Sequence, residues 1–172
     1  MPYLTSFVNA ESDVISLCIR TLSKIGGPAA LDAIEEYALK MKTPPVDELV
    51  KAWSAFDGNE YAQRVLSATL ANTSELRLSS DALLNGFEYL QHLPSLRIAN
   101  NFRLRDVVPL SPLTNLTNLE LPNCGYLQNL SGLEHLARLT RLDLQGCEKI
   151  SDVQQISTLT HLTDSVDRKS VV

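Results

Sequence analysis

The stretch that decides the fold is LTNLELPNCGYLQNLSGLEHLAR, the 23 residues from Leu116 to Arg138. The next stretch, LTRLDLQGCEKISDVQQISTLTH (Leu139–His161), has the same length and keeps apolar residues at the same positions. In both, an apolar residue recurs at every third position, interrupted by one Leu-x-Leu pair. A helix repeats about every 3.6 residues and a strand every 2. The pattern therefore predicts a coil with one short strand per turn and an apolar side chain at each corner.

Pairs of this kind occur four times and set the register of the predicted coils. They begin at Leu76, Leu96, Leu119 and Leu142. The successive intervals are 20, 23 and 23 residues. Three residues after each pair the chain has Asp81, Asn101, Cys124 and Cys147. We predict that these four residues form a structural ladder through the coils.

The pattern LxxLxLxxCxxLxxLxxLxxLxx resembles that of the leucine-rich repeat family, and Leu116–Arg138 meets every fixed position of it. The resemblance covers about Leu76–Leu162 and implies a right-handed solenoid with a short parallel sheet on its concave side. The next pair would fall at Ser165 and Asp167, which cannot continue the core. We therefore expect an α/β chain with about four repeats over residues 73–164 and a tail over 165–172.

Residues 1–72 have helical periodicity and form the first predicted domain. One apolar stripe predicts a helix over Glu11–Ile25 that ends at Gly26-Gly27, and its inward residues include Cys18. A second helix starts at Pro28. The segment TLSKIGGPAALDAI (Thr21–Ile34) resembles a HEAT-type repeat, in which one helix ends at Gly-x-Pro. This implies a HEAT-like subdomain, with an ordinary helical bundle as the alternative.

Two further helices are predicted before the repeats begin. The third follows Pro44-Pro45, with Trp53 and Phe56 on its stripe. The fourth runs from Asp57 to about Leu70, and Glu60 three residues after Asp57 predicts a reciprocal cap. The aromatic residues Trp53, Phe56 and Tyr61 are expected to seal the junction between the helices and the first repeat.

The segment Asp47–Leu66 (DELVKAWSAFDGNEYAQRVL) resembles the helices that precede the repeats in bacterial NACHT-type signalling ATPases, which are NLR-like STAND proteins. The resemblance implies a sensor or regulatory region, with an ATPase domain in cis or in trans and a role in antiphage defence. No GxxxxGK[ST] motif occurs, so this chain lacks the nucleotide-binding part. The matching residues are Trp53, Phe56, Asp57, Glu60, Tyr61, Ala62, Val65 and Leu66.

The charge and composition argue against several kinds of partner. The net charge is −5 and neither half of the chain is basic, so no nucleic acid partner is expected. No apolar run is long enough to cross a bilayer, so no membrane partner is expected. Three cysteines, an odd and small number, favour a reducing, cytoplasmic location.

The residue pattern does not predict catalysis, a cofactor or a metal site. The ladder residues Cys124 and Cys147 are expected to be buried and structural, because stacked side chains point in parallel and oppose a disulfide. A zinc site would need four ligands, which Asp81 and Asn101 do not complete. The three histidines each precede a leucine and are expected on the outer surface in solvated or capping roles. They are His92, His135 and His161.

The outward positions of the strands are the predicted protein-binding face. They alternate with the inward leucines and form a central column that runs from positive to negative, Arg77, Arg97, Glu120 and Asp143. Such a strip favours a complementary protein surface. The predicted function is therefore a non-enzymatic protein-interaction module. A stand-alone adaptor and a cysteine-dependent enzyme are the alternatives. The predicted binding residues are Arg77, Ser95, Arg97, Asn118, Glu120, Arg141, Asp143 and Gln145.

Overall fold

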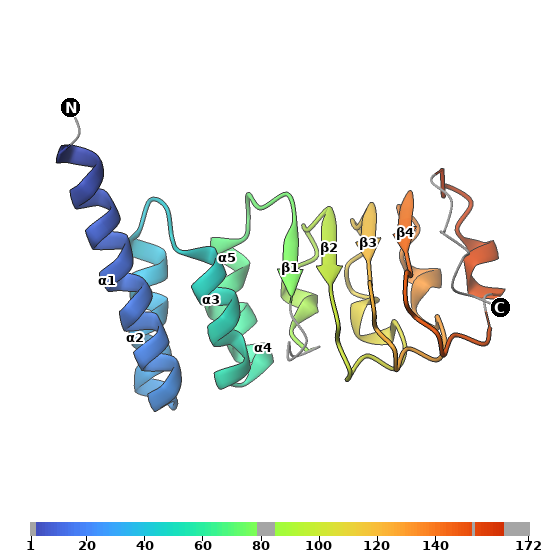
Figure 1. The fold of residues 1–172 in the computed structure, drawn as a ribbon, viewed down its shortest axis with the longest axis horizontal. Coiled ribbons are helices and arrows are strands. Elements are labelled where there is room, and N and C mark those ends of the chain that lie inside the picture. The colour runs from blue at the N-terminus through green and yellow to red at the C-terminus, as the bar shows by residue number, and fades with distance from the viewer. Residues whose placement is uncertain (1–2, 79–84, 153, 164–172) are drawn as a thin grey trace.

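The computed structural model describes residues 3–78, 85–152 and 154–163. Figure 1 shows an elongated molecule in which the helices occupy one end and four short strands follow side by side along the long axis. The strands are β1 (Leu76–Leu78), β2 (Ser95–Ile98), β3 (Asn118–Glu120) and β4 (Arg141–Asp143). They form one parallel sheet in the order of the sequence. We call the segments 76–95, 96–118, 119–141 and 142–163 coils 1 to 4.

The helical end begins with two long helices, α1 (Tyr3–Ile25) and α2 (Pro28–Lys40). They pack against each other across the turn at Gly26 and Gly27, whose φ angles of 67° and 80° are left-handed and suit glycine. The helix α1 starts at Tyr3, so the predicted start at Glu11 was wrong. Ile25 belongs to the apolar spacing of this helix, but it is the last residue of α1 and is 71% exposed.

The third predicted helix is shorter than expected, since α3 (Val46–Ala52) ends in a 3-10 turn, η1 (Trp53–Ala55). The fourth consists of α4 (Gly58–Tyr61), a π-helical turn η2 (Ala62–Leu66) and α5 (Ser67–Thr69). These three elements follow one another without a break, so the predicted fourth helix is present with a π-helical turn in its middle. Its predicted cap forms, since the Asp57 side chain accepts a hydrogen bond from the Glu60 backbone N–H at 2.9 Å.

Arg64 on the π-helical turn joins this segment to α2. Its guanidinium group donates to Glu35 at 2.9 Å and to Asp32 at 2.6 Å, and both acceptors lie on α2. It also donates to Glu60 at 3.0 Å. The Glu60 carboxylate therefore binds Arg64, one turn further along the chain. In the predicted reciprocal cap it would instead bind the backbone N–H of Asp57.

The predicted strand register is confirmed. Leu76 pairs with Leu96, Leu96 with Leu119, and Leu119 with Leu142. Each coil also contains a 3-10 turn: η3 (Phe87–Tyr89), η4 (Val108–Leu110), η5 (Leu133–His135) and η6 (Gln154–Thr158). The leucines that recur at every third position form a continuous core. Those with no exposed surface in coil 3 are Leu119, Leu121, Leu127, Leu130, Leu133, Leu136 and Leu139.

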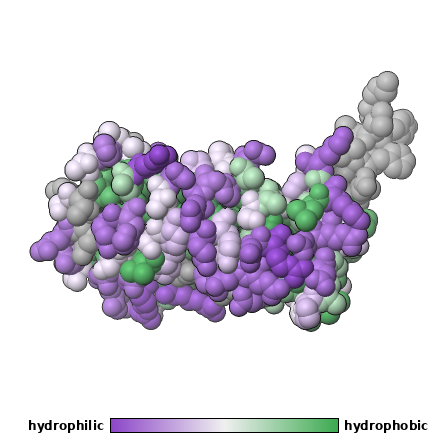
Figure 2. All heavy atoms as spheres, turned by 180° about the vertical axis from the view of Figure 1, so that it is seen from behind, coloured by the Kyte–Doolittle hydropathy of each residue, from purple (hydrophilic) through white to green (hydrophobic). Residues whose placement is uncertain are grey.

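The surface opposite the view of Figure 1 is mainly hydrophilic, and its apolar side chains form small separate patches (Figure 2). This distribution agrees with a core filled by leucines at the corners of the coils, since the polar residues between the leucines face outward. No helix among the residues that the structure describes is both long and apolar enough to cross a bilayer.

Candidate functional site

The candidate site is the outward face of the four-stranded sheet, which we call the sheet face. In its central column Arg77 lies beside Arg97, Arg97 beside Glu120, and Glu120 beside Asp143. Neighbouring parallel strands are separated by about 4.8 Å, so the column is about 15 Å long. The sequence order of two positive and two negative rungs is therefore present in space.

The middle of this column is an ion pair between strands. The guanidinium of Arg97 donates a hydrogen bond to the carboxylate of Glu120. The Glu120 side chain is only 16% exposed and that of Arg97 is 36% exposed. At the end of the column, Arg77 binds Glu75 on its own strand segment at 2.8 Å. The column therefore keeps the predicted order from positive to negative, but Arg97 and Glu120 at its middle are paired with each other and Arg77 is paired with Glu75.

The ionisation of Glu120 depends on its neighbours. Burial alone would raise the pKa of this carboxyl group. Hydrogen bonds from Arg97 and Asn118, with the charges of Arg97 and Arg141, instead hold the pKa of Glu120 below its usual value. Glu120 is therefore a carboxylate at neutral pH, held in position by hydrogen bonds from the Arg97 and Asn118 side chains.

A second column runs beside the first and contains Ser95, Asn118 and Arg141 in register. The Asn118 amide donates to the Ser95 hydroxyl at 3.0 Å and to Glu120 at 3.4 Å. Its Oδ1 atom is buried and has no hydrogen-bond partner among the residues that the structure describes. Arg141 is exposed, and the Gln145 backbone N–H donates to the Asp143 carboxylate at 2.9 Å. The predicted face residues therefore lie on one connected polar surface.

The predicted ladder uses two kinds of hydrogen bond. Asn101 is fully buried, and its Oδ1 accepts from the backbone N–H groups of Arg103 at 2.8 Å and Leu104 at 3.0 Å. The thiols of Cys124 and Cys147 donate in the other direction, to carbonyl oxygens of the preceding coil. Their acceptors are Ile98 at 3.4 Å and Leu121 at 3.1 Å. Asp81 lies outside the described residues.

The position before the ladder has a structural role that our sequence reasoning missed. Asn100, Asn123 and Gly146 there have φ angles of 55°, 57° and 74°. Only glycine, asparagine and aspartate adopt this left-handed conformation readily. A Cβ atom on Gly146 would lie 2.3 Å from Oδ1 of Asn123. The sequence could have predicted this conformation, because Asn, Asn and Gly occupy the same position of successive repeats.

The thiols of the ladder are held inside the coils. Cys124 and Cys147 have no exposed surface and all three cysteines of the chain are free. The contact between the two thiols lowers the pKa of Cys124 and raises the pKa of Cys147 well above its usual range. Cys18, which was expected in the core, is half-buried at the surface of α1.

We predict that a thiol reagent added to the folded protein modifies Cys18 first and leaves Cys124 and Cys147 unmodified until the protein unfolds, because a reagent must reach the sulfur atom. Mass spectrometry of peptides after timed labelling measures this directly. The variant Cys18→Ser is the control and should label slowly throughout. Rapid modification of Cys124 in that variant would contradict the buried ladder.

The predicted aromatic junction is present. The Trp53 indole N–H donates to the Gly58 carbonyl at 2.9 Å, and its ring meets Phe87 of coil 1 edge-on with 5.5 Å between centroids. Tyr61 is fully buried, donates to the Leu49 carbonyl at 2.9 Å, and stacks on Phe56. Burial raises the pKa of Tyr61 above its usual range. Trp53 therefore couples the helices to the first coil, whereas the contacts of Tyr61 with Leu49 and Phe56 lie within the helical end.

The histidines differ from one another in their surroundings. His92 is half-buried, and its Nε2 is 2.9 Å from the Leu70 carbonyl oxygen at the end of α5. It therefore caps the last helical turn from coil 1. His135 and His161 are exposed. Within the described residues no group of three or more His, Cys, Asp or Glu side chains has the arrangement of a metal site.

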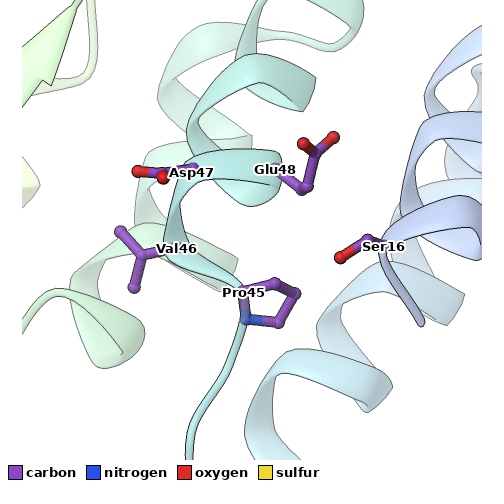
Figure 3. Close-up of a pocket in the computed structure, with 5 residues that line it drawn as sticks. All are labelled: Ser16, Pro45, Val46, Asp47 and Glu48. Atoms are coloured by element: carbon purple, nitrogen blue, oxygen red, sulfur yellow. The ribbon is translucent and has the colours of Figure 1, made fainter. Parts of the chain in front are cut away.

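A shallow hollow of about 310 Å³ lies between α1 and the start of α3. Figure 3 shows Ser16 on the α1 side facing Pro45 and Glu48. The Glu48 carboxylate lies 3.6 Å from the Arg20 Nε and accepts from Lys51 at 2.9 Å. The Glu48 charge at this hollow is therefore neutralised by the chain's own cations.

No family model and no curated protein matches this chain. One solved structure similar to it is an internalin (inlF) from Listeria monocytogenes str. 4b F2365, at 26% identity and a TM-score of 0.36. The match covers 56% of this chain and 35% of the internalin, so the chain spans about a third of that protein's length. The sheet, its register and its buried leucines carry the conclusions that follow.

Proposed function

We propose that this chain is a protein-interaction module in which a right-handed leucine-rich repeat solenoid binds a partner protein on the sheet face. The observation that carries the proposal is the Arg97–Glu120 pair at the middle of that face. The pair holds two opposite charges in fixed, half-buried positions. Such an arrangement favours recognition of a surface with complementary charges over non-specific attraction.

The area of the face sets the expected strength of binding. Four strands give a column of about 15 Å, which is small beside the roughly 800 Å² per partner of a standard interface. The flanking column of Ser95, Asn118 and Arg141 widens the polar surface. The partner is therefore expected to bind weakly or to extend its contacts beyond the sheet.

In the wider proposal, residues 1–72 are a HEAT-like capping subdomain and residues 73–164 are the repeats of a cytoplasmic NACHT-type signalling ATPase. What supports it is the resemblance of Asp47–Leu66 to the helices before such repeats, and the way Trp53 links those helices to coil 1. Partner binding on the sheet face would then be transmitted through the helices to an ATPase domain in cis or in trans. The alternative is a stand-alone adaptor with the same sheet face.

The ATPase proposal and the adaptor alternative predict different sizes for the protein that the native cell makes. The mass of the endogenous protein, measured by immunoblot and mass spectrometry from the native cell, distinguishes them. A product that contains a nucleotide-binding domain with a P-loop supports the ATPase reading. A product of this length alone supports the adaptor.

We predict that exchanging the two charges, Arg97→Glu with Glu120→Arg, abolishes capture of the partner from native cell extract while the protein stays folded. The exchanged side chains still attract each other, but each charge now faces the wrong group of the partner. The matched control is Glu36→Lys with Lys40→Glu, which exchanges an exposed ion pair on α2. The proposal fails if both variants capture the same proteins as the natural chain.

A further inference from the structure

A second surface lies on the loops that follow the strands, away from the sheet face. We call it the Tyr126 cluster and define it by Phe102, Arg105, Tyr126 and Lys149. The Phe102 and Tyr126 rings meet edge-on with 6.1 Å between centroids. The Arg105 guanidinium carbon lies 4.5 Å from the centre of the Tyr126 ring, and the Lys149 Nζ lies 4.2 Å from it. One tyrosine thus binds two cations.

The side chains of the Tyr126 cluster are exposed, but their contacts with one another restrict their conformations. Phe102 is 58% exposed and Tyr126 is 38% exposed, although both are large apolar rings. Arg105 and Lys149 are also exposed, yet contact with the ring restricts each long side chain to one region. A partner that binds these cations therefore has less side-chain freedom to remove than at an ordinary surface lysine or arginine.

The positive charge of the cluster is not neutralised by the described part of the chain. No carboxylate there lies within 4.0 Å of Arg105, Lys149 or the neighbouring Arg103. Of the acids near these cations in the sequence, Glu148 is exposed and belongs to no ion pair among the described residues, and Asp106 and Asp152 accept hydrogen bonds from the backbone N–H groups of the following turns. The cations of the sheet column, Arg77 and Arg97, are by contrast each paired. This group of cations without ion pairs is therefore a local positive region on a chain whose net charge is −5.

We propose that the Tyr126 cluster is a docking surface for an acidic, extended segment of a partner protein. The Arg105 guanidinium carbon and the Lys149 Nζ lie 4.5 Å and 4.2 Å from the centre of the same Tyr126 ring, so the two cationic groups are at most about 9 Å apart. An extended segment in the polyproline II conformation advances about 3.1 Å per residue and repeats every three residues, so carboxylates three residues apart lie on one side at about that separation. An apolar side chain between them would contact the Phe102 and Tyr126 rings.

The same residue types also occur in sites for single-stranded nucleic acid, where bases stack on aromatic rings. Such sites need a positive groove that follows several phosphates. The Tyr126 cluster, with Arg103 beside it, offers three cations on a chain that is acidic overall. The acidic peptide is therefore the better fit.

The experiment titrates the isotope-labelled full chain with the blocked peptide Gly-Glu-Phe-Gly-Glu-Gly, and follows the Phe102 and Tyr126 ring signals and the Gly125 amide by NMR. We expect these signals to shift with peptide and the affinity to fall with added salt. The charge-reversal variant Arg105→Glu with Lys149→Glu should bind about tenfold more weakly. A peptide with glutamine in place of both glutamates should produce no shifts.

The matched control reverses two exposed cations at the helical end, Lys24→Glu with Lys42→Glu, and changes the net charge equally. It should bind the peptide within about twofold of the natural chain, once long-range screening is accounted for. Equal weakening in both variants would overturn the proposal, because attraction would then be non-specific. Shifts confined to other residues, or tighter binding of a single-stranded oligothymidylate to the same signals, would overturn it as well.

Discussion

The variant Trp53→Ala is expected to lose about 3–5 kcal/mol of the free energy of unfolding, the usual cost of removing a buried large aromatic side chain. Trp53 is 2% exposed, and its ring is the contact between the helices and Phe87 of coil 1. Its loss leaves a cavity and frees the Gly58 carbonyl from its hydrogen bond. Denaturant unfolding followed by circular dichroism measures the change.

The variant Trp53→Phe is the matched control for this prediction. It keeps a ring against Phe87 and removes chiefly the indole hydrogen bond to Gly58, so a loss of about 1 kcal/mol is expected. Trp53 is the only tryptophan of the chain, so its fluorescence in the natural protein reports on this junction alone. If the fluorescence and circular dichroism midpoints differ widely, the helices and coils do not unfold together and the proposed coupling is wrong.

The variant Gly132→Ala is expected to destabilise the chain by about 3 kcal/mol. Gly132 has a φ of 105°, where a residue with a Cβ atom pays about 1–2 kcal/mol. The new Cβ would also lie 2.6 Å from the Val107 carbonyl carbon and the Val108 nitrogen, which are backbone atoms of coil 2. Coils 2 and 3 would have to separate to admit it. Denaturant unfolding gives the free-energy change.

The control for Gly132 is another glycine of coil 3. A Cβ on Gly125 would meet no atom within 4 Å, so Gly125→Ala should change the unfolding free energy by less than about 1 kcal/mol. Both variants add a single methyl group, so their difference isolates the close approach of the coils. Equal unfolding midpoints for the two variants would show that Gly132 does not need to be glycine and that the coils pack less tightly than described.

The sheet was predictable because its register is fixed by buried residues. Shifting Leu119 by one position would turn its side chain from the core to the solvent, so the Leu-x-Leu pairs determine which residues lie side by side. The same register places Arg97 beside Glu120, and their ion pair could have been predicted from it. The predicted strip of charges, running from positive to negative, did not include this pairing between neighbouring strands.

Other features depend on backbone geometry that spacing does not specify. The start of α1 at Tyr3 was missed because Glu11 interrupts the helical spacing of apolar residues that begins with Leu4, Phe7 and Val8. The π-helical turn at Ala62–Leu66 has the same apolar spacing as a regular helix. The Tyr126 cluster joins residues from three coils through loop conformations, and the left-handed Asn123 precedes one of those loops.

The most direct test of the proposed recognition compares partner affinity in three variants: Arg97→Glu, Glu120→Arg and the two together. Each single variant places like charges side by side, and should lose both stability and binding. The double variant restores the attraction between the two strands. Denaturant unfolding is expected to show that the double variant regains stability, and calorimetric titration with the captured partner that it still binds at least about tenfold more weakly. Recovery of full affinity in the double variant would contradict the account, because the pair would then only stabilise the sheet.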